Sequence, residues 1–237
     1  MKKLLIIQNI TREAPGLLAD VLNKHKIAYD CIDLSRDYQE PVLDNYSGLI
    51  ILGGPDSAND QTPKTIYERK LVKKALDAQM PMLGICLGLQ VLVKVAGGIV
   101  TKNHVQEIGF LDPAQEPYVI DLTEEGKNDP LLKNLPERFP IFQLHGEIVG
   151  LTDSMVLLGT GKHCRNQIVK IARCVYGLQG HLELTERMLE DWAMHDIDLI
   201  SRDKTELLAY YTKMQQSYTV MGATLCENFL RLAGFLK

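Results

Sequence analysis

The first hundred residues alternate between short, continuously apolar runs and segments with helical spacing. The apolar runs are "KLLIIQNI" (3–10), "AYDCIDL" (28–34), "GLIILGG" (48–54) and "PMLGI" (81–85). Helical spacing follows over 14–26, over about 63–78 and in "LGLQVLVKVAGG" (87–98). A strand that is apolar throughout is buried on both faces, and strands that alternate with helices form parallel sheets with helices on both sides. The pattern therefore predicts an α/β fold with an open, mostly parallel sheet.

The remainder of the chain has a different pattern. From about 99 to 180, short apolar segments separated by Gly, Pro, Asp and Asn turns predict a small antiparallel extension. After 184 the spacing is helical again, with Thr185 as an N-cap and a second helix over about 203–234. We expect residues 1–200 to form one domain and 201–237 to be a C-terminal helical extension packed on it. The last helix carries an apolar stripe from Leu207 to Phe229, so a homodimer contact is an open alternative.

Composition excludes several classes of protein. The net charge of −4 gives no electrostatic support for binding nucleic acid or an anionic membrane. No apolar stretch approaches the roughly 20 residues that a membrane span needs. The five cysteines are odd in number, widely spread and without a C-x-x-C pair. We therefore expect neither a disulfide framework nor a metal site, and we expect a reducing, cytoplasmic location.

Cys86 stands between a strand pattern and a helix pattern, with Gly84 and Gly88 two residues away on either side. A strand that passes directly into a helix must turn sharply, and small neighbours let the backbones approach. This is the spacing of the G-x-S-x-G nucleophile elbow, with sulfur in place of hydroxyl. The following helix N-terminus favours a thiolate, and its N–H groups, including that of Leu87, can face an oxyanion. Cysteine is often a core residue, and we expect that role for Cys31 and Cys226.

A thiol nucleophile needs a base and a group that orients this base. His145 and His181 both follow apolar, strand-like runs, and Glu183 follows His181 by two residues. In an extended segment, residues i and i+2 project to one face, so a carboxylate there can hold the imidazole in the required tautomer. The turn "GGP" at 53–55 is either a plain turn or a further source of N–H donors.

The chain resembles the class I, triad-type glutamine amidotransferases, and in particular free-standing proteins similar to the amidotransferase domain of GMP synthase. The matching segments are "LGGP" (52–55), "GICLGLQVL" (84–92), "EIG" (107–109), "FQLHGE" (142–147), "NQ" (166–167) and "GLQGHLELT" (177–185). The resemblance implies the flavodoxin-like fold of that family. It assigns the catalytic roles of nucleophile, base and orienting group to Cys86, His181 and Glu183. It places an oxyanion hole at Gly54 and Leu87, and substrate contacts at Gln90, Gly53, His145 and Glu147.

The implied activity is hydrolysis of the glutamine side-chain amide through a cysteine γ-glutamyl thioester, with release of ammonia and without a cofactor. No G-x-x-x-x-G-K-[ST] phosphate loop is present, so we expect any ammonia-accepting synthase to be a separate partner. Two alternatives are a γ-glutamyl peptide hydrolase with the same triad and a non-catalytic regulatory module. Gly180 stands where the family usually has an aromatic residue, and either opens the substrate pocket or gives the backbone room.

Overall fold

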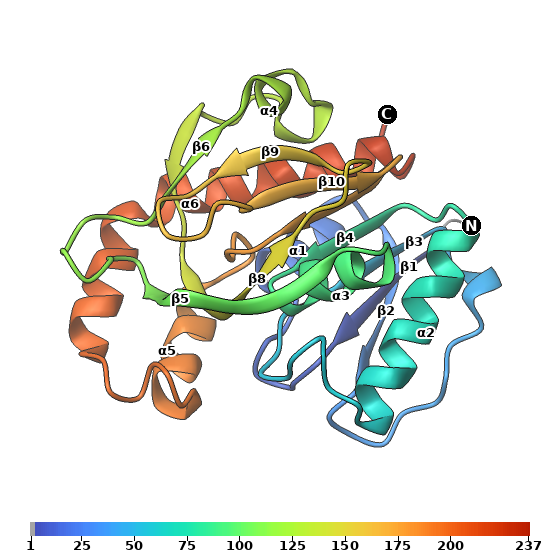
Figure 1. The fold of residues 1–237 in the computed structure, drawn as a ribbon, viewed down its shortest axis with the longest axis horizontal. Coiled ribbons are helices and arrows are strands. Elements are labelled where there is room, and N and C mark those ends of the chain that lie inside the picture. The colour runs from blue at the N-terminus through green and yellow to red at the C-terminus, as the bar shows by residue number, and fades with distance from the viewer. Residues whose placement is uncertain (1–2) are drawn as a thin grey trace.

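The computed structural model describes residues 3–237, and its main sheet has the strand order β2-β1-β3-β4-β11-β10-β9-β6-β7 (Figure 1). The strands of this sheet are β1 (Lys3–Gln8), β2 (Ala28–Asp33), β3 (Gly48–Ile51), β4 (Met82–Ile85), β6 (Val119–Leu122), β7 (Arg138–Pro140), β9 (Val156–Thr160), β10 (Ile168–Ala172) and β11 (Val175–Leu178). The pairs from β2 to β11 are parallel, and those from β11 to β7 are antiparallel. The expected sheet with its antiparallel extension is confirmed.

A second, two-stranded sheet consists of β5 (Ile99–Gly109) and β8 (Gln143–Gly150), which pair antiparallel. The sequence pattern did not predict β5 as a separate strand. Most of its first eight residues are exposed or half-buried, and its pairing with β8 shifts register between Lys102 and Glu107. A long strand that is largely solvent-exposed and irregular in register does not show a regular alternation of apolar and polar residues.

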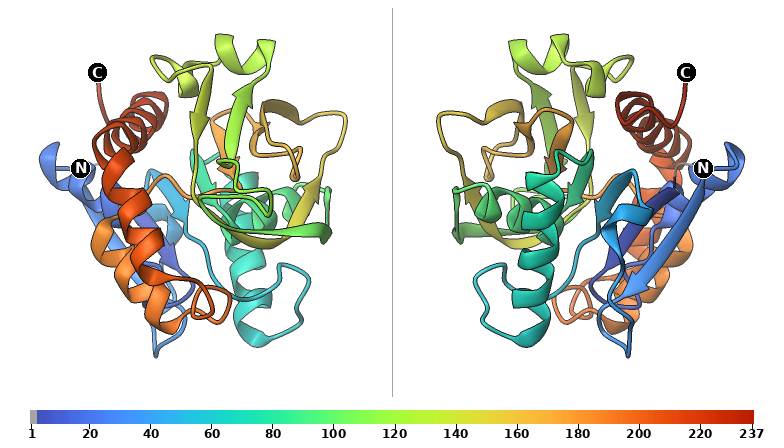
Figure 2. Two further views of the ribbon diagram at one scale, coloured as in Figure 1. Left: turned by 90° about the vertical axis from the view of Figure 1, so that its left-hand side faces the viewer. Right: turned by 90° about the vertical axis from the view of Figure 1, so that its right-hand side faces the viewer.

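Helices cover both faces of the main sheet (Figure 2). The helices are α1 (Gly16–Lys24), α2 (Pro63–Asp77), α3 (Leu87–Val95), α4 (Glu124–Asn128), α5 (Glu186–His195) and α6 (Lys204–Leu232), with short 3₁₀ turns at Leu43–Asn45 and Pro130–Leu132. Helix α6 packs against α1 and α5, whereas α2 packs against α3. The Thr185 side chain accepts a hydrogen bond from the Met188 N–H at the start of α5, which confirms the expected N-cap. No described helix is long and apolar enough to span a membrane.

Strand β1 shows why the apolar runs are continuous. Leu4 and Ile6 pack in one core with α1, α5 and α6, whereas Leu5 and Ile7 pack in the other core with α2 and α3. All four side chains are fully buried. Because successive residues of a strand point to opposite faces, a strand between two helical layers needs an apolar residue at every position.

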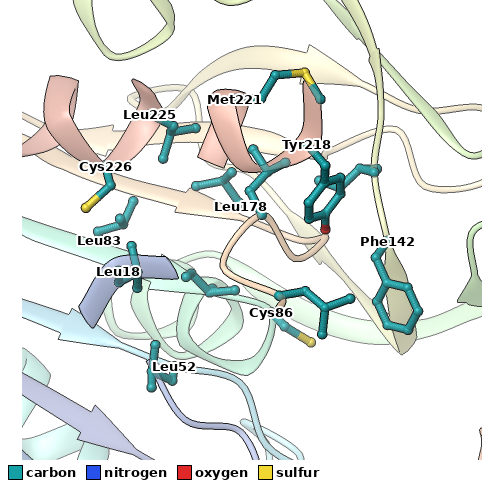
Figure 3. Close-up of a cluster of buried hydrophobic side chains, with 14 of the residues drawn as sticks. Leu18, Leu52, Leu83, Cys86, Phe142, Leu178, Tyr218, Met221, Leu225 and Cys226 are labelled. Atoms are coloured by element: carbon teal, nitrogen blue, oxygen red, sulfur yellow. The ribbon is translucent and has the colours of Figure 1, made fainter. Parts of the chain in front are cut away.

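The apolar stripe of α6 is covered by the chain itself. Its buried members are Tyr211, Tyr218, Met221, Leu225 and Phe229. Figure 3 shows Met221 and Leu225 in the same cluster as Leu83 of β4 and Leu18 of α1. These side chains are therefore not available for a dimer contact. Cys226 is buried in this core as expected, but the expectation for Cys31 is wrong, because it is exposed on the edge strand β2.

We expect Gly88→Ala to lower the free energy of unfolding by more than about 2 kcal/mol, because overpacking against rigid backbone is costly. A Cβ on Gly88 would lie 2.1 Å from the carbonyl oxygen of Ile51, so α3 would have to move away from β3. Urea unfolding followed by circular dichroism measures the change. The control is Gly146→Ala, whose Cβ would meet only the flexible Gln106 side chain, at 3.1 Å. Equal stability of the two variants would contradict this account of the turn.

Candidate active site

The carboxyl ends of the parallel strands bring distant segments of the chain together. In the register of the sheet, Ile51 at the end of β3 pairs with Gly84 of β4, and Ile85 pairs with Leu178 at the end of β11. The segments that follow these strands therefore emerge at one edge of the sheet, which is where open α/β folds bind ligands. The glycine turn, Cys86 and His181 all lie in these segments.

Cys86 occupies a sharp turn between β4 and α3. It has a φ of 51° and a ψ of −108°, a conformation that L-residues rarely adopt and that costs of order 1–3 kcal/mol. A Cβ on Gly84 would lie 2.5 Å from the backbone of Gly88, so both flanking glycines are required by close backbone approach. The Cys86 N–H donates to the carbonyl of Leu178. The N–H groups of Leu87 and Gly88 lie in the first turn of α3, where no intrahelical acceptor exists.

His181 and Glu183 form a buried pair, with 2.6 Å between Nδ1 of the imidazole and Oε1 of the carboxylate. The two-residue spacing thus places both groups on one face, as the sequence predicts. Burial alone would lower the pKa of His181, but the Glu183 carboxylate and hydrogen bonding with Cys86 and Glu183 outweigh it and raise this pKa well above its usual range. Because Nδ1 is held by Glu183, Nε2 is the nitrogen available on the side of the thiol.

Aromatic rings pack around His181 from elsewhere in the chain. Trp192 of α5 meets the imidazole edge-to-face with a ring-centre distance of 5.1 Å, and Phe142 lies at 6.3 Å. The Tyr218 hydroxyl donates to the backbone carbonyl of His181. These contacts fix the ring and keep water from it.

Gly180 does not open the pocket. A Cβ at this position would lie 2.7 Å from Cδ1 of Ile141 and 2.9 Å from Oε1 of Gln143. The space beside Gly180 is thus filled by other side chains, and the residue is absent from the cavity lining. The sequence leaves open whether Gly180 widens the substrate pocket or gives the backbone room. The structure supports the second alternative.

A cavity of about 220 Å³ lies over Cys86. Its lining comes from residues 54–57 after β3, from Cys86 and Gln90, from residues 144–147 of β8, and from residues 196–198 after α5. Glu13, in the segment between β1 and α1, completes the lining. The cavity is therefore assembled from five separate parts of the sequence, and the Cys86 thiol faces the Leu144 carbonyl at 3.6 Å.

The other residues singled out in the sequence lie in or beside this cavity. Gly54, Gln90, His145 and Glu147 line it directly. The Gln90 amide donates to the Glu147 carbonyl at 3.2 Å, and the Ser57 hydroxyl donates to the Glu147 carboxylate at 2.8 Å. Gly53 lies behind the lining, where a Cβ would meet Glu13 at 2.2 Å and the His181 ring at 3.1 Å. Leu87 is buried, so only its backbone can serve the site.

A second group of cysteine, histidine and glutamate lies next to the first. Glu107, His145 and Cys164 are all buried, and their ligand-type atoms lie within 4.8 Å of one another. Nε2 of His145 is 2.8 Å from Oε2 of Glu107, which also accepts a hydrogen bond from Gln167. Burial raises the pKa of the Cys164 thiol to about 12. No sequence spacing indicated this group, because its members come from β5, β8 and the loop before β10.

Sequence reasoning also missed four of the acidic side chains of the cavity, namely Glu13, Asp56, Asp196 and Asp198. Burial raises the pKa of Glu13 to about 7, although the nearby His181 opposes the shift. One signal could have found Glu13: β1 ends at the same edge as β3 and β4, so the segment after it must reach the site. Asp196 and Asp198 gave no such signal, because they arrive from the connection between α5 and α6.

In sequence the chain is similar to proteins named as glutamine amidotransferase-like proteins or GMP synthases. The chain is 31% identical over 160 residues to the putative glutamine amidotransferase-like protein YfeJ of Salmonella typhimurium, covering 65% of this chain and 64% of that protein. It is 28% identical to a glutamine-hydrolyzing GMP synthase subunit of Methanoregula boonei, over 62% of this chain and 71% of that one. It matches only 26% of the length of the GMP synthase of Borreliella burgdorferi, with 32% identity over 62% of this chain.

A solved structure extends the likeness over nearly the whole chain. A glutamine amidotransferase from Thermotoga maritima superposes with a TM-score of 0.85 and 25% identity, covering 98% of both chains. The structure of a glutamine amido transferase from Methylobacillus flagellatus has the same fold, with a TM-score of 0.85 and 23% identity. The family model of class I glutamine amidotransferases matches residues 15–194. The chain belongs to the class I glutamine amidotransferase family.

Proposed function

We propose that the protein hydrolyses the γ-amide of glutamine, with Cys86 as nucleophile, His181 as base and Glu183 as the group that orients His181. The observation that carries the proposal is the strained turn that holds Cys86 under the cavity beside the His181–Glu183 pair. Backbone strain at a non-glycine residue persists only where the surrounding structure enforces it, and it concentrates at active sites.

The proposed reaction has two halves. His181 takes the thiol proton, and the Cys86 sulfur bonds to the carbonyl carbon of the glutamine side-chain amide while the carbonyl oxygen becomes an oxyanion. The N–H groups of Gly54 and Leu87 stabilise this charge. His181 then gives its proton to the amide nitrogen, and the C–N bond breaks. Ammonia is released, and a γ-glutamyl thioester remains on Cys86. A water molecule, deprotonated by His181, attacks the thioester and releases glutamate.

The second cysteine group is a weaker candidate for this chemistry. Cys164 has no exposed surface, and its thiol donates to the Asn166 carbonyl. It is absent from the cavity lining, and the backbone around it shows no positive φ. A thiol with a pKa of about 12 is almost entirely protonated at neutral pH and is a poor nucleophile. We assign the Glu107–His145 pair a supporting role, because it anchors β5 to β8 below the substrate contacts.

A second version of this function is supply of ammonia to a separate synthase. The observation that favours it is the likeness to a protein named as a subunit of GMP synthase. A supplying subunit gains from being idle until its partner docks, whereas a free-standing hydrolase does not. Turnover of glutamine and γ-glutamyl dipeptides by the isolated protein separates the two versions, since brisk turnover argues against a required partner.

We expect iodoacetamide to alkylate Cys86 before any other thiol at pH 7. Partial burial of the sulfur and the Asp33 carboxylate raise the pKa of Cys31 to about 11, and burial raises the pKa of Cys226 to about 12. Both are therefore protonated, whereas Cys86 lies beside a histidine base. Peptide mass spectrometry after short labelling times gives the order. Labelling of Cys31 first would remove the support for Cys86 as the activated thiol.

We expect Cys86→Ala to abolish release of ammonia and glutamate, and His181→Ala to reduce acyl-enzyme formation by at least about 10³-fold. Glu183→Gln is expected to be milder, because a neutral amide still partly orients the imidazole. Hydroxylamine trapping of the thioester, followed by mass spectrometry, reports acyl-enzyme directly.

The matched control for these variants is Cys164→Ser, which alters the neighbouring buried thiol. We expect it to retain turnover and thioester trapping. Loss of activity in Cys164→Ser together with an active Cys86→Ala would reverse the assignment of the nucleophile.

A further inference from the structure

The cavity lining is acidic. Among residues 3–237 it contains Glu13, Asp56, Glu147, Asp196 and Asp198, and no lysine or arginine. Two of these carboxylates are neutralised by cations outside the lining: Asp56 is 2.5 Å from Lys64, and Asp196 is 2.7 Å from Arg12. The other three have no ion-pair partner among residues 3–237. These three carboxylates are thus the acidic groups of the lining that no described lysine or arginine pairs with.

Glu13 is the most unusual of these side chains. It is 5% exposed, and its Oε2 has no hydrogen-bond partner among the described residues. A buried polar atom without a hydrogen-bond partner costs about 1–3 kcal/mol. Such an atom therefore calls for an explanation, and a bound ligand that supplies the missing hydrogen bond is one. Glu13 lines the cavity and lies close to the His181 ring, since both would touch a Cβ placed on Gly53.

The unpaired carboxylates belong to two parts of the lining. Glu147 contacts Ser57 and Gln90, where the glutamyl head is proposed to bind. Glu13 instead lies near Asp196, and the Asp198 N–H donates to Asp196 at 3.0 Å. Ile197, between these two aspartates, lines the cavity and is 85% exposed. Glu13 and Asp198 are called the acidic wall below.

The leaving group departs toward the acidic wall. In the proposed reaction His181 protonates the leaving nitrogen, so this nitrogen is next to His181 when the C–N bond breaks. Glu13 lies close to the His181 ring, since a Cβ placed on Gly53 would meet both side chains. Glutamine has one ammonium and one carboxylate and a net charge of zero. It can pair its ammonium with Glu147, but it brings no charge to the acidic wall.

On the basis of the proposed function, we propose that the acidic wall binds a second ammonium group carried by the leaving amine. The preferred substrates are then γ-glutamyl amides of diamines or polyamines. The methylene chain of the amine lies along Ile197, and its terminal ammonium pairs with Asp198 or Glu13. The chemistry is otherwise unchanged: the Cys86 sulfur bonds to the carbonyl carbon of the γ-glutamyl amide, the amine leaves with a proton from His181, and water releases glutamate.

The test compares three amides of the same length that differ in terminal charge. These are γ-glutamyl-1,4-diaminobutane, γ-glutamyl-n-pentylamide and γ-glutamyl-4-aminobutyrate. We expect kcat/KM to be on the order of tenfold higher for the cationic amide than for the neutral one, and lowest for the anionic one. The preference should shrink as salt is raised, because the wall is partly exposed. Equal kcat/KM values for the cationic and neutral amides would overturn the proposal.

Variants locate the effect. Asp198→Asn and Glu13→Gln should each reduce the ratio of kcat/KM for the cationic amide to that for the neutral amide. The control is Asp77→Asn, in the last turn of α2, which leads into the start of β4 and so lies at the opposite edge of the sheet. Among the described residues this exposed aspartate is paired only with Lys73, and the ratio should not change. A ratio that Asp198→Asn and Glu13→Gln leave intact would contradict the assignment to the acidic wall.

Affinity measurements distinguish a failure of the acidic-wall proposal from a failure of the proposed hydrolytic function. Calorimetry with Cys86→Ala measures the affinity for the cationic and neutral amides without turnover, and equal Kd values overturn the acidic-wall proposal alone. Hydrolysis of all three amides at similar rates would agree with the proposed catalytic triad and would contradict only the preference for a cationic amine. Tighter binding of the cationic amide without any thioester on Cys86 in the unaltered protein supports the wall and rejects the hydrolytic function.

Discussion

The close approach of α3 to the central strands is the constraint on which the rest of the site depends. Gly88 lies so near the Ile51 carbonyl, and Gly84 so near Gly88, that neither position has room for a side chain. This contact forces Cys86 into a positive φ and turns its thiol toward the cavity. The strain is held by two hydrophobic cores that fix the strands and the helix on both faces of the sheet.

Burial and charge act together on the histidine. A fully buried imidazole would resist protonation, but the Glu183 carboxylate at 2.6 Å compensates for the lost hydration. Trp192 and Phe142 then limit the motion of the ring. In the neighbouring group, Glu107 and His145 make a similar pair, but Cys164 is set in a fully buried environment that raises its pKa to about 12. Of the two cysteines, only Cys86 lines the cavity, and it does so from a strained turn.

The scaffold determines the proposed reaction, whereas the cavity lining determines which leaving group is accepted. The sheet order, the turn at Cys86 and the His181–Glu183 pair are features of the proposed chemistry, and the chain superposes on a family member over 98% of its length. The acidic wall comes from the segment after β1 and the connection after α5, which are far apart in the sequence. Loops vary more easily than the elements that they connect, so the choice of leaving group is where members of one family can diverge.

The sequence by itself determined the parallel sheet, the turn at Cys86 and the pairing of His181 with Glu183. Each of these follows from local rules: apolar runs bury strands on both faces, paired glycines permit a close crossing, and residues i and i+2 of an extended chain share a face. Only the tertiary structure decided that Gly180 gives backbone room, that aromatic rings reach His181 from α5 and residue 142, and that Glu13 and Asp198 line the cavity. These contacts join residues far apart in the sequence, and their positions depend on how the whole sheet twists and packs, which no local pattern encodes.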